Sequence, residues 1–427
     1  MRVWPALKTG ILVVLVGTSL VLSEELWTGG WGGVGEVSYS SEPSLPQASV
    51  PTEFAAITPC RVVLTGTDSS VSALFMPGTE DYKDWMARLG QAHIFSLHVV
   101  SSLPKSMVRS VEFDFGVNMS YQELIHYVPG LQPSVLPKQG QTVYLYQSET
   151  TGPVMLGLVS QAGTYVAQTD LSVSEFSSMF HHAIVLDPWE VWNRQADSFV
   201  PKNSIDMFRV DVSVTSRSVI PLVHSFFVNP QALTSVPESQ SMILWTDGSR
   251  AVWWDEQKHT LTYADPNLAS STTSKSMAVT DILTYASSHG GAADGSILFQ
   301  TSVTANNASW TLRPYAFGFP IVSSDQSVVL QSVGSHVAKY QLPVNELRFG
   351  HKTLVHIIGA SQLATILRRL MPTTPVSELS VELGYTLLPA NGHTNQLEPA
   401  YIISQSGMPL WEIDAVSGQV LKGMKIS

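Results

Sequence analysis

The sequence predicts an α+β protein with an N-terminal single transmembrane helix, a linker, and a three-domain extracytoplasmic part of antiparallel sheets with packed helices. Several segments alternate apolar and polar residues, as half-buried strands do, and capping boxes precede helical apolar patterns. One uncharged run near the N-terminus is followed by a stretch rich in Gly, Ser and Pro. We expect this organisation: 1–27 for the cytoplasmic N-terminus and anchor, 28–58 for the linker, 59–204 for an α+β domain, 205–275 for a mainly β domain, and 276–427 for a second α+β domain.

The composition narrows the classes of function. Hydrophobic residues make up 44% of the 427 residues and charged residues 13%, which is enough apolar material for folded domains. The net charge of −11 disfavours nucleic acid, because such binding depends on cations that neutralise phosphates. The single cysteine, Cys60, cannot form an intrachain disulfide, and we expect it to be buried.

The N-terminal run is interpreted as a retained membrane anchor. Arg2 and Lys8 precede an uncharged stretch over 9–23, and Glu24 and Glu25 follow it. The positive-inside rule therefore places the N-terminus in the cytoplasm and the remainder outside. Fifteen residues span only about 22 Å as a helix, so the snorkelling of Lys8 would have to extend the span.

A cleaved signal peptide is the alternative for the same run. Val21 and Ser23 are acceptable residues at the −3 and −1 positions for cleavage before Glu24. The order Leu22–Ser23 is not the small-x-small pattern that cleavage prefers, so the retained anchor is favoured.

One face of the predicted anchor is a candidate for contact with other membrane helices. Gly10 and Gly17 lie seven residues apart and so share a face, which lets another helix approach closely. Val14 separates them, so the pattern is not GxxxG. We assign the transmembrane interaction to Gly10, Val14, Gly17, Thr18 and Val21.

The domain predicted over 59–204 mixes helices and strands. Helical spacing of apolar residues predicts a helix within 79–94, and capping boxes predict helices after Ser120, with Glu123, and after Ser172, with Glu175. Strands are predicted over 141–149 and 152–161.

The segment over 205–275 reads mostly as sheet. In 208–215, alternate residues share one face: Phe208, Val210, Val212 and Val214. The stretch 242–266 predicts a three-strand meander, because Asp247–Gly248 is a strong hairpin-turn signal and polar residues precede the last strand. We therefore interpret Asp247 and Gly248 as a structural turn and not as a reaction centre.

The last segment begins with a predicted helix over 276–291 and continues in short strands. A second helix carries its apolar residues on one face and ends before Pro372. These residues are Leu363, Ile366, Leu367 and Leu370. The end, 397–421, is predicted as a hairpin and a tail.

Motifs for catalysis or metal binding are few. "FDFG" over 113–116 contains the Asp-Phe-Gly of kinases, but it lacks their other motifs and alternates like a strand. "GWGGVG" over 30–35 lies in the linker, so it is not a dinucleotide loop. We expect no catalytic residue and no cofactor.

Histidine and carboxylate pairs do not make a convincing metal site. His181 and His182 are adjacent, so on one helix they diverge by about 100° and cannot share an ion. His351 and His356 are five residues apart, which is again a poor pairing. Asp187 and Glu190, which flank Trp189, are expected in a solvated loop.

A ligand-sensing module remains an alternative function. Three tryptophans, at 245, 253 and 254, could stack on sugars of a wall fragment or bind a peptide, although strand alternation puts Trp253 and Trp254 on opposite faces. A secreted hydrolase is a weaker alternative, because no preorganised site is visible.

Five segments in a fixed order, after the apolar anchor, carry a resemblance to a known family. They are "LWTGGW" at 26–31, "VEFDFGVNMSYQEL" at 111–124, "WTDGSRAVWW" leading to "LTYADP" at 245–266, "GFPIVSSD" at 318–325, and "LGYTLLP…LEPAYIISQSG" at 383–407. In these segments the chain resembles the YycH family of regulatory proteins, which accompany the essential WalK/WalR two-component system of Gram-positive bacteria.

The resemblance implies a non-catalytic function. It implies a three-domain external part whose second and third domains resemble the partner regulator YycI, with no enzyme activity and no cofactor. It also implies that the transmembrane helix contacts the sensor kinase WalK and sets its output in the control of cell-wall metabolism. The retained anchor is further favoured on this ground.

Overall fold

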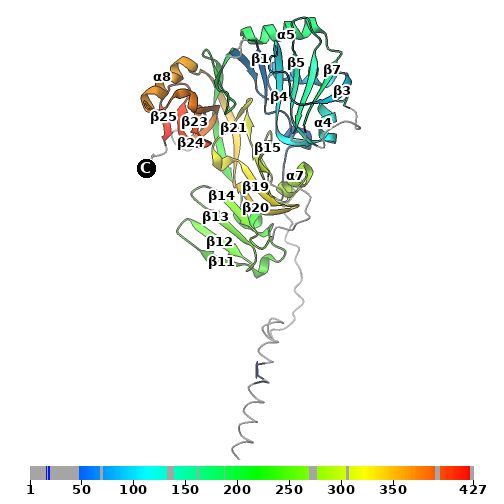
Figure 1. Ribbon diagram of the computed structural model, residues 1–427. Helices are drawn as coiled ribbons and strands as arrows, with labels where there is room; N and C mark the ends of the chain where they lie inside the picture. The colour runs from blue at the N-terminus through cyan, green and yellow to red at the C-terminus, as the bar shows by residue number, and fades with distance from the viewer. Residues whose placement is uncertain are drawn as a thin grey trace, which may run out of the picture. The chain divides into compact units, whose positions relative to one another are not determined.

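The computed structural model describes residues 16, 18–19, 48–67, 71–131, 139–160, 163–186, 188–268, 277–303, 307–389 and 395–423. The chain divides into two compact units, Met1–Ser44 and Leu45–Ser427. In the first unit, Val16, Thr18 and Ser19 are helical and exposed. The second unit, called the body below, contains all the named sheets. Every named strand pair in it is antiparallel, so the α+β prediction is confirmed for the body (Figure 1).

A nine-stranded sheet is built from residues 61–201. Its strands, in spatial order, are β3 (Ile94–Val100), β7 (Gly163–Thr169), β6 (Met155–Ser160), β5 (Gln139–Gln147), β4 (Arg109–Ser120), β1 (Arg61–Gly66), β2 (Val71–Phe75), β8 (Trp189–Asn193) and β9 (Ser198–Pro201). The expectation of a solvated loop around Trp189 is wrong, because Trp189 is buried in β8 and β8 pairs with both β2 and β9.

Three helices accompany this sheet, and their starts agree with the predicted capping. They are α3 (Glu80–Gln91), α4 (Tyr121–Tyr127) and α5 (Val173–Leu186). Ser120 and Glu123 form both halves of a capping box on α4. The backbone N–H of Glu175 donates to Ser172 Oγ at the start of α5. Trp85 of α3 meets Phe176 of α5 edge to face, with ring centroids 5.7 Å apart.

An eight-stranded sheet crosses the boundary predicted at residue 275. Its order is β11 (Thr234–Pro237), β12 (Met242–Thr246), β13 (Ala251–Asp255), β14 (Thr260–Ala264), β20 (His336–Pro343), β19 (Val328–Val333), β16 (Asn307–Arg313) and β15 (Ile297–Val303). The predicted meander is present as β12, β13 and β14, and β14 continues the sheet by pairing with β20. Helix α7 (Val279–Ser288) contributes Ile282 and Leu283 to the adjoining core.

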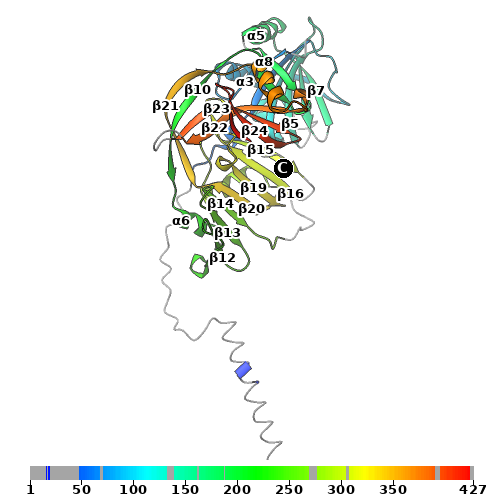
Figure 2. The same ribbon diagram turned by 90° about the vertical axis from the view of Figure 1, so that its left-hand side faces the viewer.

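A six-stranded sheet contains most of the remaining chain. It runs β21 (Asn345–His356), β10 (Asp206–Ser216), β23 (Asn395–Gln405), β24 (Met408–Asp414) and β25 (Val420–Gly423), with β22 (Ser380–Pro389) paired to β23. Helix α8 (Ala360–Leu370) packs on its core through Leu363 and Leu367, with Ile366 and Leu370 half-buried, as predicted. Figure 2 shows β10 and β21 as a long pair.

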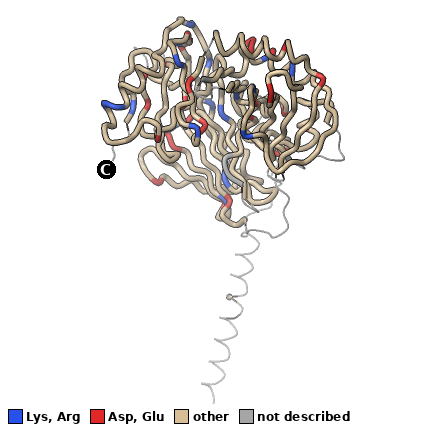
Figure 3. Tube along the Cα trace, turned by 45° about the horizontal axis from the view of Figure 1, so that its top comes forward, with Lys and Arg blue, Asp and Glu red and all other residues tan. Residues whose placement is uncertain are grey.

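Short elements complete the body. They are α2 (Glu53–Ala56), α6 (Val219–His224), the hairpin of β17 (Tyr315–Ala316) and β18 (Phe319–Pro320), and the 3₁₀ turns η1 (Pro230–Ala232), η2 (Ser324–Gln326) and η3 (Val376–Glu378). Basic and acidic residues are interspersed along the body (Figure 3).

Strand β10 carries the predicted alternation, with one exception. Val210 and Val212 are buried and Val214 is half-buried, but Phe208 is 36% exposed. Opposite Phe208 on the edge strand β21 stands the exposed Leu354, and the Phe208 ring meets Phe317 edge to face with ring centroids 5.6 Å apart.

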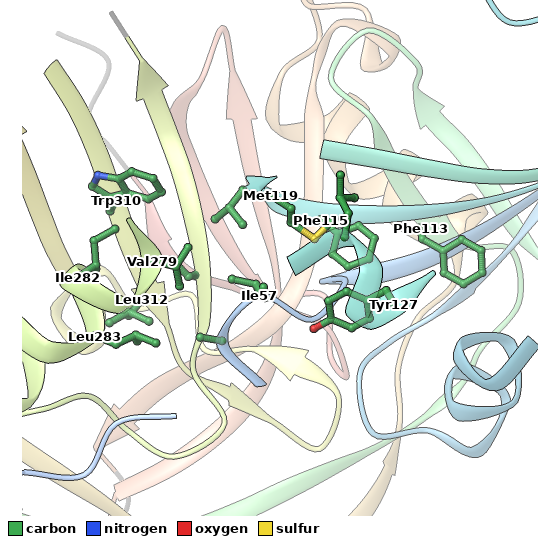
Figure 4. Close-up of a cluster of buried hydrophobic side chains, with 14 of the residues drawn as sticks. Ile57, Phe113, Phe115, Met119, Tyr127, Val279, Ile282, Leu283, Trp310 and Leu312 are labelled. Carbon is green, nitrogen blue, oxygen red and sulfur yellow. The ribbon is translucent and has the colours of Figure 1, made fainter. Parts of the chain in front are cut away.

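One hydrophobic core is shared by the nine-stranded and eight-stranded sheets. Ile57, which is fully buried, lies between Phe115 and Tyr127 on one side and Val279 and Leu312 on the other (Figure 4). Residues 48–58 were assigned to the linker on composition. The described structure corrects this, because they include α2 and place Ile57 in the core.

Gly116 lets the two sheets approach each other. A β-carbon added to this residue of β4 would lie 2.7 Å from Phe299 Cδ1 and 2.9 Å from the carbonyl oxygen of Leu298, both in β15. Two residues further along β4, Asn118 Nδ2 donates to Gln300 Oε1 at 2.9 Å and ties β4 to β15. The "FDFG" segment is therefore a strand whose glycine serves packing.

Gly116→Ala should destabilise the body by about 1–3 kcal/mol, the usual cost of forcing extra atoms into a packed interior. Gly66→Ala in the neighbouring strand β1 is the matched control, because its β-carbon would meet only Phe180 at 3.7 Å. Urea unfolding of both variants measures the difference. Equal midpoints would show that the contact between β4 and β15 is not tight.

Candidate functional site

The predicted transmembrane face lies almost wholly outside the described residues. Gly10, Val14, Gly17 and Val21 are not among them, and Thr18 is described only as an exposed helical residue. Within the described part of the chain, no helix has the length and apolar character needed to cross a membrane. The assignment of this face to helix contact stays a prediction.

Asp247 and Gly248 lie in the connection between β12 and β13. Asp247 Oδ1 accepts hydrogen bonds from the backbone N–H groups of Ser249, at 2.9 Å, and Arg250, at 2.8 Å. Gly248 has a φ of +89°, which glycine adopts without strain. Burial would raise the pKa of Asp247, but the hydrogen bonds from Arg250 and Ser249 outweigh it and lower the pKa. These contacts hold a turn.

The tryptophans next to this turn do not form one binding surface. Trp254 packs against the hydrophobic core, as does Trp245. Trp253 lies on the opposite face of β13, and its Nε1 donates to Glu238 Oε1 at 3.3 Å. Only one of the three is therefore placed for stacking outside the core.

The first described residues of the body are tied to α7 and to the loop that follows it. The backbone N–H of Ala48 donates to the carbonyl of Ser287, and Ser287 Oγ donates back to the carbonyl of Ala48, both at 3.0 Å. The carbonyl of Ser49 accepts from the N–H of Ala292 at 3.0 Å, and Ser49 Oγ donates to Asp294 Oδ1 at 2.7 Å. Residues 48–49 are called the linker clamp below.

Gly291 makes the linker clamp possible. Its φ is +75°, and a β-carbon at this position would overlap the carbonyl oxygen of Ser49. Ala48 and Ser49 also line a groove of about 670 Å³ together with Arg217 and the start of β21. The chain therefore enters the body at a fixed place on the α7 side.

A second cavity, of about 320 Å³, is lined by residues of all three sheets and includes the charged side chains of Arg61, Asp114, Asp197 and Glu382. Its lining comes from β1, β4, β8 and β9 of the nine-stranded sheet, from Phe299 of β15, and from β22 and β23 of the six-stranded sheet. The volume lies in the range of small-molecule sites, about 300–1,000 Å³. We call it the junction cavity.

Arg61 is the centre of the first charged group in the junction cavity. Its Nε donates to Asp114 Oδ2 at 3.1 Å, and its Nη1 donates to the carbonyl of Asp197 at 2.9 Å. Its Nη2 pairs with the carboxylates of both Asp114 and Asp197, and the guanidinium lies 5.3 Å from the Phe199 ring centroid. Burial lowers the pKa of Arg61, but the carboxylates of Asp114 and Glu112, together with Cys60, outweigh it and the pKa is raised.

Arg313 forms the second charged group, at the edge of the junction cavity. Its Nη1 donates to Glu382 Oε1 at 2.5 Å, and its guanidinium carbon lies 5.2 Å from the Phe299 ring centroid. Glu382 and Phe299 both line the cavity. Arg313 belongs to the eight-stranded sheet and Glu382 to the six-stranded sheet, so this ion pair also joins two sheets.

The reactive side chains near these ion pairs are held in their neutral forms. Cys60 is buried, as predicted, and burial, reinforced by the Asp114 carboxylate, raises the pKa of its thiol well above the ordinary value. Burial likewise raises the pKa of the Tyr315 hydroxyl well above its usual range. A protonated thiol is a poor nucleophile, so Cys60 is not activated for attack in this environment.

The predicted histidine and carboxylate pairs lie elsewhere. His181 and His182 are exposed on α5, and His356 pairs with Asp206. Glu190 is in β8, whereas Asp187 lies outside the described residues. Across the described ranges, no group of three or more His, Cys, Asp or Glu side chains is placed to hold a metal ion.

Sequence reasoning missed the junction cavity because its charges come from distant segments. Arg61 and Asp197 are separated by 136 residues, and Arg313 and Glu382 by 69. Asp114 was visible inside "FDFG", but its partner could not be read from the sequence. A weak signal was available: charged residues that interrupt strands in a chain with only 13% charge.

Comparison of structures identifies the fold. The crystal structure of YycH from Bacillus subtilis aligns with 85% of this chain and 98% of that chain, with a TM-score of 0.56 and 10% sequence identity. An uncharacterized protein from Eubacterium rectale ATCC 33656 aligns with 57% of this chain, with a TM-score of 0.36 and 10% identity. No protein-family model and no curated protein sequence matches the chain. The fold is YycH-like.

Asp114→Asn should lower the free energy of unfolding by about 1–3 kcal/mol, because it removes the main charge partner of a largely buried guanidinium. The control is Glu80→Gln, which breaks the exposed pair with Lys83 at 2.7 Å and should cost less than about 0.5 kcal/mol. Denaturant titration of both variants tests this. A loss as small for Asp114→Asn as for Glu80→Gln would mean that the Arg61 group contributes little to stability.

Proposed function

We propose that this protein is a membrane-anchored, non-catalytic extracytoplasmic regulator of a WalK-like sensor histidine kinase that controls cell-wall metabolism. The observation that carries the proposal is the YycH-like fold over 85% of the chain. The anchor-like run over 9–23 adds support from the sequence.

In this proposal the anchor helix is the part that meets the kinase. The N-terminus lies in the cytoplasm, a single span crosses the cell membrane, and the body lies outside. The face with Gly10 and Gly17 permits close backbone approach, which is the main source of helix association in lipid. Val14, Thr18 and Val21 would complete the contact.

In this proposal, binding of a ligand or a partner to the body outside the cell would be transmitted to the anchor helix. The linker clamp supports this division of labour, because Ala48 and Ser49 are fixed to the body by hydrogen bonds while the anchor lies further toward the N-terminus. A YycI-like regulator is proposed as a second partner, acting together with this chain on the kinase.

Deletion of residues 1–27 should abolish co-purification with the cognate sensor kinase from detergent-solubilised membranes, whereas the full chain should bring the kinase down. Gly10→Leu/Gly17→Leu should weaken the association, because two large side chains would hold the helices apart. Western blotting of the bound kinase measures both effects.

The matched control is Val16→Leu/Ser19→Leu, which adds bulk to the opposite side of the predicted helix and should leave the association unchanged. Equal recovery of kinase by the chain without residues 1–27 would place recognition in the body and contradict the role of the anchor. Undiminished recovery by the double glycine variant would contradict the assigned face.

A further inference from the structure

The junction cavity has a net negative lining, and a second guanidinium, that of Arg313, lies beside it with donors to spare. Asp114, Asp197 and Glu382 line the cavity together with Arg61, so carboxylates outnumber guanidinium groups there. Arg61 is fully engaged by Asp114 and Asp197. A cationic group would therefore be attracted into the cavity, while Arg61 itself has little capacity for an incoming anion.

Arg313 provides hydrogen-bond donors that complement the acidic lining of the cavity. A guanidinium has five N–H donors. Among the described residues, only Glu382 accepts a hydrogen bond from Arg313. The Arg313 side chain is 31% exposed, and its guanidinium carbon lies 5.2 Å from the centroid of the Phe299 ring, which lines the cavity. The remaining donors suit a carboxylate, which guanidinium groups bind with two parallel hydrogen bonds.

Glu382 connects the acidic lining of the cavity with Arg313. One of its oxygens, Oε1, accepts from Arg313, whereas among the described residues no donor reaches Oε2. Asp114 likewise uses only Oδ2 for Arg61. An ammonium group needs several oxygen acceptors, and the carboxylates of Glu382, Asp114 and Asp197 belong to the same lining. Apolar side chains such as Phe319 and Leu383 complete the wall.

From this arrangement we infer that the junction cavity binds a small zwitterion, a free amino acid or a short peptide. Its ammonium would lie among Glu382, Asp114 and Asp197, and its carboxylate would lie on Arg313. The inference goes beyond regulation of a kinase and does not depend on it, because binding is a property of this chain alone.

The occupant would connect all three sheets. Arg61 and Asp114 belong to the nine-stranded sheet, Arg313 to the eight-stranded sheet, and Glu382 to the six-stranded sheet. A ligand held by all of them adds contacts between parts of the body that are distant in the sequence. Occupation should therefore raise the unfolding temperature of the full chain.

Isothermal titration of the full chain in detergent micelles with alanine and dialanine tests the inference. Two blocked forms separate the contributions of the charges: N-acetyl-dialanine lacks the ammonium, and dialanine amide lacks the carboxylate. The zwitterions should bind, and each blocked form should bind about tenfold more weakly or worse, because each loses a set of charge-assisted hydrogen bonds.

The variants locate the site. Arg313→Gln should weaken dialanine but leave dialanine amide unchanged, and Glu382→Gln should weaken both. Arg88→Gln is the matched control, because Arg88 pairs with Glu175 at 3.0 Å with a similar exposure of 34% and lies outside the junction cavity. Circular dichroism and the unfolding temperature establish that each variant is folded.

Three results would overturn the inference. They are no heat from either zwitterion up to about 10 mM, equal binding of dialanine and its blocked forms, and weakening by Arg88→Gln as large as by Arg313→Gln. Because no kinase is present in the titration, a failure here leaves the proposed function standing. Failure of the kinase co-purification likewise leaves ligand binding intact.

Discussion

At Gly116, strand β4 passes so close to β15 that Phe299 and the carbonyl oxygen of Leu298 occupy the space of a β-carbon. This contact brings the nine-stranded and eight-stranded sheets together over a common apolar core, with Ile57 at its centre. Because the two sheets share buried side chains, neither can shift without exposing them to water. The positions of Arg313 and Phe299 relative to Arg61, and hence the shape of the junction cavity, follow from this packing.

The charged residues of the junction cavity are partly exposed, although Arg61, Asp114 and Arg313 belong to the inner strands β1, β4 and β16. Their side chains keep 20–51% exposure, so water still solvates part of each charge and the desolvation cost is smaller than for a fully buried pair. Phe199 and Phe299 cover one guanidinium each, which orders the arginines at small entropic cost. The body thus places these ion pairs where its sheets meet, in a chain that is otherwise poor in charge.

Local structure could be predicted from the sequence more completely than long-range structure. Capping at Ser120, the apolar stripe of α8 and the strands around Asp247 follow from neighbouring residues, so periodicity and turn chemistry predict them. The pairing of β14 with β20 depends on residues 75 to 83 positions apart, which no local pattern encodes. Residues 48–58 were misjudged because Gly, Ser and Pro dominate the preceding stretch, whereas Ile57 is held by tertiary packing alone. The partners of Asp114 and Glu382 were invisible for the same reason.

The linker clamp gives the body a definite point of mechanical loading. Any tension along the chain before Ala48 is borne first by its hydrogen bonds to Ser287 and to the loop that holds Ala292 and Asp294. That loop ends at Ile297, where β15 begins, and the third residue of β15 is Phe299, which forms part of the cavity wall. Tension on the chain before Ala48 and a molecule bound in the junction cavity would therefore act on opposite ends of one short, stiff segment. Tension would change the free energy of binding in the cavity, and binding would change the resistance of the segment to tension.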